Sequence, residues 1–138
     1  MGMGRRLTAL LAVLVMLLLA ACQGKPLPGG MEETALLDAG QEALLMLAGG
    51  DYEGVFGLLR EDVAEALTAE DIRDLALRQL DGAGVYKQIE SRMATGQSSD
   101  GEDYGVAVFY CEYSKKDVLV RLAFDPDYAL IGLEIKKQ

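Results

Sequence analysis

The pattern of apolar and polar residues changes once along the chain, from helical spacing in the first half to alternation in the second. Residues 32–48 are predicted to form a helix, because apolar side chains recur there at helical spacing. They are Leu37, Leu44, Leu45 and Ala48. Two glycines end this pattern, and Asp51 is placed to cap a second, short helix. Its apolar side consists of Val55, Phe56, Leu58 and Leu59. Thr68 and Asp71 have the spacing of a capping box, which opens a third helix that runs to Leu80.

After a glycine-containing turn at residues 81–84, apolar and polar residues alternate, which indicates strands. We expect strands at 85–93, 104–113, 118–124 and 129–135, with a polar loop at 94–103. Short turns at 114–117 and 125–127 should join the last three strands into an antiparallel meander. The apolar face of the third strand is Val118, Val120, Leu122 and Phe124, and that of the fourth is Ile131, Leu133 and Ile135.

This order of elements predicts an α+β fold, in which two to three N-terminal helices pack on a curved antiparallel sheet of about four strands. A chain of 138 residues suits one domain with a short appendage. We place the domain at residues 31–138. A signal segment is expected at 1–21, and a flexible tether at 22–30, where two prolines and three glycines occur.

The first 21 residues have the organisation of an export signal. Arg5 and Arg6 precede 13 residues, Leu7–Leu19, in which Thr8 is the only polar side chain. A membrane span needs about 20 apolar residues, so this shorter run suits a secretory signal peptide better. The sequence LAAC at 19–22 follows, and it resembles the lipobox of bacterial lipoproteins. The resemblance implies cleavage between Ala21 and Cys22 and attachment of a diacylglycerol to the Cys22 thiol. The alternative is an ordinary signal peptide in which Cys22 is incidental.

Charge and composition exclude several classes of function. Cleavage before Cys22 would remove two of the 13 basic residues and none of the 22 acidic ones, which leaves a net charge of 11 − 22 = −11. A domain this acidic is unsuited to nucleic acid, and acyl chains would have to hold it on the membrane. The sequence contains no histidine, so no imidazole base or ligand is available. Acylation of Cys22 would leave Cys111 without a partner, and its place in a strand predicts a buried, unreactive thiol.

The order of helices followed by strands resembles the cystatin-like superfamily, which includes nuclear transport factor 2. Several segments are more closely similar to a bacterial family known as domain of unknown function 3887. They are GDYEGV at 50–55, LTAEDI at 67–72, GVYKQI at 84–89 and the three terminal strands. The resemblance implies the fold and an extracytoplasmic location, because that family occurs in lipoproteins, but it implies no activity.

No residue pattern points to a catalytic or metal site. Enzymes of related fold place an aspartate base beside a tyrosine in a cone-shaped cavity, but no predicted core face pairs an acid with a tyrosine. Glu112 and Glu134 lie on strands and should face water. The acids of residues 100–103 could hold calcium, but a solvated loop explains them more simply. The sequence GGDYEG lacks the lysine of a phosphate loop and is better explained as a turn between helices. We therefore expect no catalytic residue, no cofactor and no metal.

The two tyrosines of the second strand give a hint of binding. Tyr110 and Tyr113 are an odd number of residues apart, so they should point to opposite faces, one into the core and one outward. We expect a lipid-anchored domain, outside the cytoplasm on the cell membrane, that binds a protein or small-molecule ligand on its concave sheet face without catalysis. A small cavity enzyme of the isomerase or dehydratase type is the alternative, and a passive structural lipoprotein is a third possibility.

Overall fold

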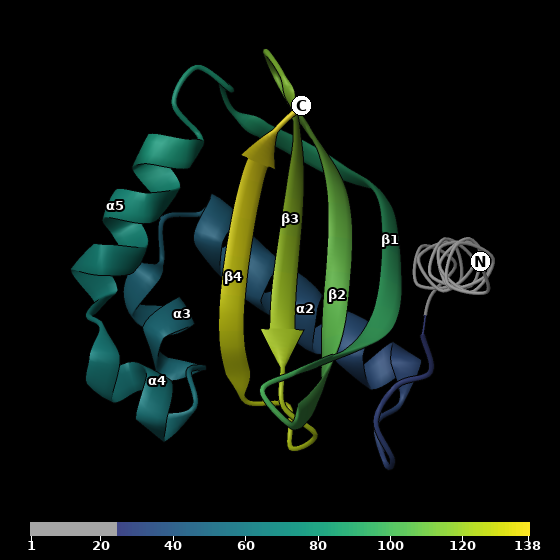
Figure 1. Ribbon diagram of the computed structural model, residues 1–138. Coiled ribbons are helices and arrows are strands. Elements are labelled where there is room, and N and C mark those ends of the chain that lie inside the picture. The colour runs from purple at the N-terminus through teal and green to yellow at the C-terminus, as the bar shows by residue number, and fades with distance from the viewer. Residues whose placement is uncertain (1–24) are drawn as a thin grey trace, which may run out of the picture.

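The computed structural model describes residues 25–138. The helices in this range are α2 (Glu33–Ala48), α3 (Tyr52–Gly57), α4 (Glu61–Ala66) and α5 (Ala69–Gln79). The strands are β1 (Tyr86–Ser99), β2 (Glu102–Tyr113), β3 (Asp117–Phe124) and β4 (Leu130–Lys137). Helices precede strands, as predicted, and together they form an α+β fold (Figure 1). None of the helices in residues 25–138 is long and apolar enough to cross a membrane.

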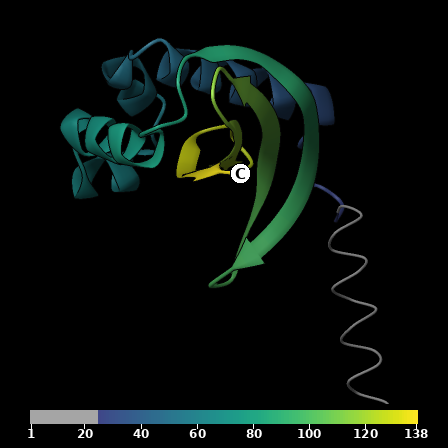
Figure 2. The same cartoon turned by 90° about the horizontal axis from the view of Figure 1, so that it is seen from above.

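The four strands form one antiparallel sheet in the order β1-β2-β3-β4. Figure 2 shows that the long hairpin of β1 and β2 bends strongly, with β4 on the inside of the bend. The predicted polar loop at 94–103 is wrong, because β1 and β2 stay paired as far as Ser99 and Glu102. Asp100 and Gly101 alone make the turn, with φ of 53° and 79°, as in the type I′ turns that suit two-residue hairpins. Polar side chains fit these strand ends because residues 98–101 are exposed to solvent.

The three predicted helices are present with nearly the expected bounds. Asp51 caps α3 by accepting a hydrogen bond from the backbone N–H of Gly54 at 2.9 Å. Thr68 and Asp71 form the predicted capping box at the start of α5, with both reciprocal hydrogen bonds present. Helix α4 is missing from the prediction, because its six residues contain one large apolar side chain, Val63, and show no helical period.

The core lies between α2 and the sheet, which α2 crosses on one face (Figure 1). The helix comes closest at Gly40, where a Cβ would stand 2.7 Å from the Cβ of Ala107 and 2.9 Å from the Cε2 of Phe109. Only glycine allows this approach. The predicted inward face of β3 is confirmed, since all four of its side chains are buried: Val118, Val120, Leu122 and Phe124.

The segment that precedes α2 is held against β1. The backbone N–H of Lys25 donates to Thr95 Oγ1 at 3.1 Å, and the N–H of Gly96 donates to the carbonyl oxygen of Lys25 at 3.1 Å. Leu27 packs against the core. The prediction of a flexible tether is therefore wrong for residues 25–28, which lie against the sheet in spite of their two prolines. Their backbone can approach β1 because Gly96 has no side chain.

Candidate functional site

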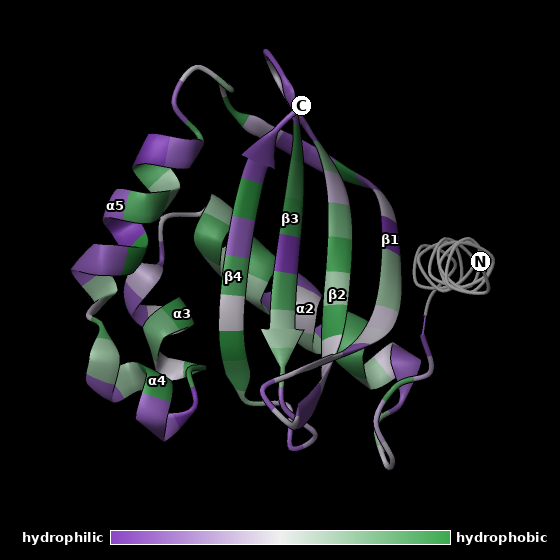
Figure 3. Ribbon diagram, viewed as in Figure 1, coloured by the Kyte–Doolittle hydropathy of each residue, from purple (hydrophilic) through white to green (hydrophobic). Residues whose placement is uncertain are grey.

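An apolar groove lies between α3, α4 and α5 on one side and β4 on the other, with a volume of about 240 Å³. Figure 3 shows apolar residues on the lower half of β4 and on α3 beside it. The lining residues are Val55, Leu59, Val63, Leu67, Asp71, Ile72, Leu75, Leu130, Ile131, Gly132 and Leu133. Asp71 is the single ionisable residue among them, so the groove offers almost only aliphatic contact.

The start of β4 is tied to the connection between α3 and α4. The backbone N–H of Arg60 donates to the carbonyl oxygen of Leu130 at 2.9 Å, and the N–H of Leu130 donates to that of Leu58 at 3.0 Å. Leu59 and Leu130 thus form a short parallel bridge. Apart from this bridge, no strand in residues 25–138 pairs with the edge of β4 that faces away from β3. The backbone edge of β4 at residues 131–133 therefore borders the groove.

Strand β4 contains one residue more than β3 at the groove. Phe124 pairs with Leu130, whereas Ala123 pairs with Gly132, so Ile131 has no partner on β3 and forms a bulge. The prediction that Ile131 shares the inward face of Leu133 and Ile135 is therefore wrong. Leu133 and Ile135 pack with the core and Ile131 does not, although both Ile131 and Leu133 line the groove. Alternation counted along the sequence fails here, because one extra residue reverses the faces on either side of it.

Asp71, the one ionisable residue of the groove, is hydrogen-bonded to the backbone at the start of α5. The Asp71 carboxylate accepts a hydrogen bond from the N–H of Thr68 at 2.8 Å, and the N–H of Asp71 donates to Thr68 Oγ1 at 3.2 Å. The groove therefore presents apolar side chains beside an unpaired strand edge.

Arg60, next to the groove, joins three segments that are far apart in the sequence. Its Nε lies 2.8 Å from Asp62 Oδ1, and its Nη1 lies 3.5 Å from Asp125 Oδ2 and also contacts Glu102. The hydrogen bond from Arg60 lowers the pKa of Asp62, and hydrogen bonds to Asp62 and then Glu102 raise the pKa of Arg60. This cluster fixes the α3–α4 connection to the β1–β2 and β3–β4 turns.

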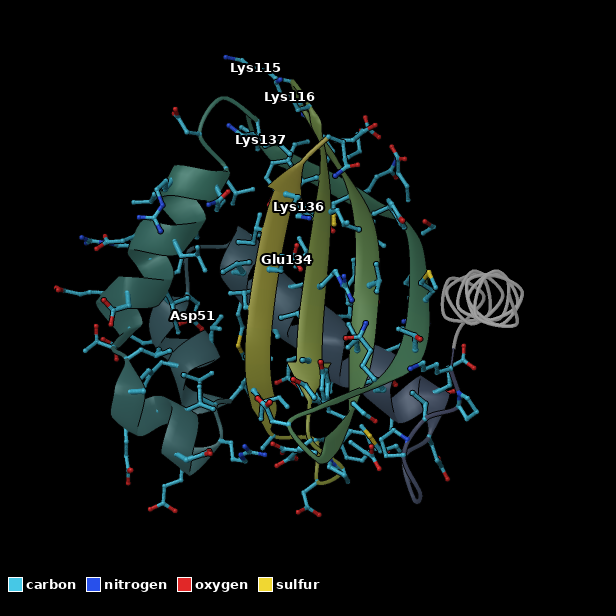
Figure 4. The ribbon with its side chains drawn as sticks, viewed as in Figure 1. Asp51, Lys115, Lys116, Glu134, Lys136 and Lys137 are labelled. Atoms are coloured by element: carbon cyan, nitrogen blue, oxygen red, sulfur yellow. The ribbon has the colours of Figure 1, made fainter. Side chains whose placement is uncertain are left out.

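The helix-free face of the sheet, which the sequence indicated as the contact surface, contains an open hollow of about 310 Å³. Its polar groups are largely paired with one another. The Tyr104 hydroxyl donates to Gln97 Oε1 at 3.1 Å, while Glu134 lies 3.0 Å from Lys136 and 3.9 Å from Arg121. Figure 4 shows Glu134 and Lys136 on β4, with the other labelled lysines gathered at the end of the sheet. This hollow is more polar than the groove and lacks its free strand edge.

The other residues that the sequence analysis considered as candidates do not lie together in the structure. Ala21 and Cys22 lie outside the described residues. Cys111 is buried as predicted, with 1% of its surface exposed, and burial raises the pKa of its thiol to about 11. Tyr110 is 43% exposed and Tyr113 is buried, which confirms that they point to opposite faces. Burial also raises the pKa of Tyr113, to about 12.

The acidic side chains near the β1–β2 turn do not converge on one point. Glu102 contacts Arg60, and Asp103 accepts a hydrogen bond from Ser98. Within residues 25–138 no group of three or more acidic or cysteine side chains could hold a metal ion. Glu112 accepts a hydrogen bond from the amide of Gln88 at 2.9 Å.

The alternative of a small cavity enzyme concerns the hydrogen-bond partners of the tyrosine hydroxyls. Those of Tyr104 and Tyr128 bond to Gln97 and to the backbone N–H of Glu32. Hydrogen-bonded carboxylate–tyrosine pairs, which that alternative requires, are absent from the described range.

Sequence reasoning missed the groove, because it missed α4 and the bulge at Ile131. One signal was available. Glu61 and Asp62 suit the first turn of a helix, and Val63 and Leu67 have the i, i+4 spacing of one helical face. Nothing comparable marks the contact between the α3–α4 connection and β4, since the bridge uses backbone atoms.

The fold and the groove define a small α+β domain with its helices on one side of an antiparallel sheet. Residues 41–133, about two thirds of the chain, match the family described as Protein of unknown function (DUF3887), and the chain belongs to this family. Among solved structures, the NMR structure of a protein from Ruminococcus gnavus ATCC 29149 is similar, with a TM-score of 0.67 and 25% sequence identity. The similarity covers 80% of this chain and 96% of that one. No curated protein matches the chain.

Proposed function

We propose that this protein is a lipoprotein, anchored to the outer side of a cell membrane through Cys22, whose domain binds an extended apolar segment of a partner protein without catalysis. The observation that carries the binding proposal is the groove, in which ten of the eleven lining residues are not ionisable and an unpaired edge of β4 lies alongside. A surface of this kind gains free energy by removing apolar area from water.

The size and chemistry of the groove favour peptide side chains over a whole small molecule. Small-molecule sites typically have volumes of about 300–1,000 Å³ and several polar groups that orient the ligand. The groove has about 240 Å³, and its one ionisable group is engaged within α5. A strand edge can accept an extended peptide by backbone hydrogen bonding, while alternate side chains of that peptide enter the neighbouring pocket. Both features of this site suit such a segment.

The anchoring proposal rests on the sequence. The two arginines, the run of 13 residues with a single polar side chain and LAAC at 19–22 stand in the order that an exported lipoprotein requires. We also infer membership of the cystatin-like superfamily, which the packing of helices on a bent antiparallel sheet supports. Replacing Cys22 by alanine tests the anchor. Loss of labelled palmitate and release of the protein from the membrane fraction are expected, and a variant that stays fully membrane-bound would contradict the proposal.

The groove is tested with a defined probe, a synthetic peptide of alternating leucine and serine residues, titrated into the isotopically labelled soluble C22A mature chain. We expect the backbone amide resonances of residues 131–135 to shift. The variant Leu75→Glu, which places a charge in the groove, should abolish the shift. Its matched control is Leu77→Glu on the same helix, because Leu77 is 57% exposed and lies outside the groove. The binding proposal fails if the peptide causes no shift at millimolar concentration, or if dodecanoate shifts these resonances and the peptide does not.

A further inference from the structure

The segment before α2 determines how far the domain can stand from its anchor. Two backbone hydrogen bonds hold Lys25 on β1, one to Thr95 Oγ1 and one from the N–H of Gly96, each 3.1 Å long. A Cβ at Gly96 would stand 2.0 Å from the carbonyl oxygen of Pro26, so this close approach depends on glycine. The chain is therefore already fixed to the sheet edge at Lys25, well before the first helix begins.

Cys22 precedes Lys25 by only three residues. Three fully extended residues span about 10–11 Å. The headgroup region on each side of a bilayer is roughly 5–8 Å thick, so an acylated Cys22 at its inner border would bring Lys25 to the membrane surface. A domain tethered this closely has little freedom to turn its other faces toward the lipid.

We propose that the β1 edge of the domain lies against the lipid headgroups and that the apolar groove faces away from the membrane. This inference rests on the proposed acylation of Cys22. The partner of the β1 edge is the headgroup layer itself, and the segment fixed at Lys25 sets the orientation.

The charges along the β1 edge suit that contact. Exposed Lys87 and Arg92 lie on β1 with Glu90, and Lys25 adds a third cation. Asp38, 3.7 Å from Arg92, and Asp103, which lines a hollow together with Lys25, add two further carboxylates, so the edge is close to neutral. The mature chain as a whole has a net charge of −11 (11 − 22), which anionic lipids would repel. The nearly neutral β1 edge is therefore repelled less than the rest of the domain within the Debye length of about 8–10 Å.

The orientation places the groove far from the bilayer. In Figure 1, β1 and the segment fixed to it lie on one side of the molecule, and α5 with the groove lies on the opposite side, beyond β4. Three strand spacings of about 4.8 Å and a helix diameter of about 10 Å separate β1 from the far side of α5 by on the order of 25 Å. A partner that binds there must therefore approach from the aqueous side.

The test uses the full acylated protein in vesicles of phosphatidylcholine with a minority of phosphatidylglycerol and a spin-labelled lipid headgroup as quencher. A thiol-reactive fluorophore is placed at Met93→Cys on β1, at Leu77→Cys on α5 or at Lys116→Cys in the β2–β3 turn. All three sites are exposed, and the one other free thiol in the described range, Cys111, is buried. We expect quenching at residue 93 to exceed that at residues 77 and 116 several-fold. Equal quenching at residues 93 and 77, or the strongest quenching at residue 116, would overturn the orientation.

The fixed segment is tested separately. Thr95→Val removes the acceptor for the N–H of Lys25, whereas Thr95→Ser keeps a hydroxyl and is the matched control. The valine variant should lose much of the difference between residues 93 and 77, and the serine variant should retain it. A long glycine–serine insertion between Gly24 and Lys25 should remove the difference altogether, and its persistence there would contradict the role of the short reach. Palmitate labelling is measured on the same samples, so unlabelled protein refutes the anchor itself, whereas labelled protein without a preferred side refutes only the orientation.

Discussion

Replacing Gly40 by alanine tests how closely α2 is packed on the sheet. The added methyl group would stand 2.7 Å from the Cβ of Ala107 and 2.9 Å from the Cε2 of Phe109. Attractive contacts between carbon atoms have optima of about 3.5–4.0 Å, so both distances are repulsive. Ala107 and Phe109 have 0% exposure, and neither side chain can move aside into solvent. The helix or the sheet must therefore shift.

The expected loss of stability follows from two opposing effects. Overpacking a core by a methyl group costs about 1–3 kcal/mol, while alanine within a helix is favoured over glycine by about 1 kcal/mol. We expect a net decrease of up to about 2 kcal/mol in the free energy of unfolding. For a domain of this size each kcal/mol corresponds to a melting temperature lower by about 4 °C.

The assay is urea unfolding of residues 22–138 with Cys22→Ala, followed by circular dichroism, with the m-value as a check on two-state behaviour. Gly57→Ala is the control, because a Cβ there meets nothing within 4 Å. The double variant Gly40→Ala with Ala107→Gly should recover part of the loss, since it removes the nearest atom. A Gly40→Ala variant at least as stable as the parent would refute this account of the packing.

Three further predictions concern the thiol, a helix cap and a turn. The folded state raises the pKa of Cys111 from its ordinary value of about 9 to about 11, so stability should fall as the pH rises from 9 to 11, by up to about 3 kcal/mol. Cys111→Ala should remove this component from the pH dependence of the urea midpoint, and an unchanged slope would contradict it. Thr68→Ala should lower stability by about 1 kcal/mol through loss of the capping box, while Thr68→Ser should not. Gly101→Ala should cost about 1 kcal/mol, because φ is 79° there, and an unchanged melting temperature would count against the type I′ turn.

The sequence was informative wherever one local pattern determines one element. The α2 range, the Asp51 cap, the Thr68 capping box and the inward face of β3 each depend on residues close together in the chain, and the structure confirms them. The polar end of the first hairpin has the composition of a loop, yet its residues remain paired in β1 and β2. Pairing with the neighbouring strand can hold polar residues in a strand when no helix covers them.

The candidate site could not be predicted from residues that are close together in the sequence. Ile131 faces the groove because of a bulge that alternation cannot reveal, and the groove itself exists only once the α3–α4 connection meets β4. Backbone atoms of Arg60 and Leu130 make that contact, and backbone atoms have no sequence signature. The same holds for Lys25, whose contact with Thr95 joins residues 70 positions apart.

The ion cluster at Arg60 has a consequence for the order in which the molecule folds. Arg60 and Glu102 are 42 residues apart, and Asp125 is further along the chain, so the cluster closes long loops and carries their entropy cost. Contacts of this kind form after local helices and hairpins, so we expect the cluster to form late in folding, after the transition state. Removing the ion cluster by substitution of Arg60 should therefore raise the unfolding rate far more than it lowers the folding rate. Because the walls of the groove come from α3, α4 and α5 on one side and from β4 on the other, a growing chain cannot form the groove until β4 has followed.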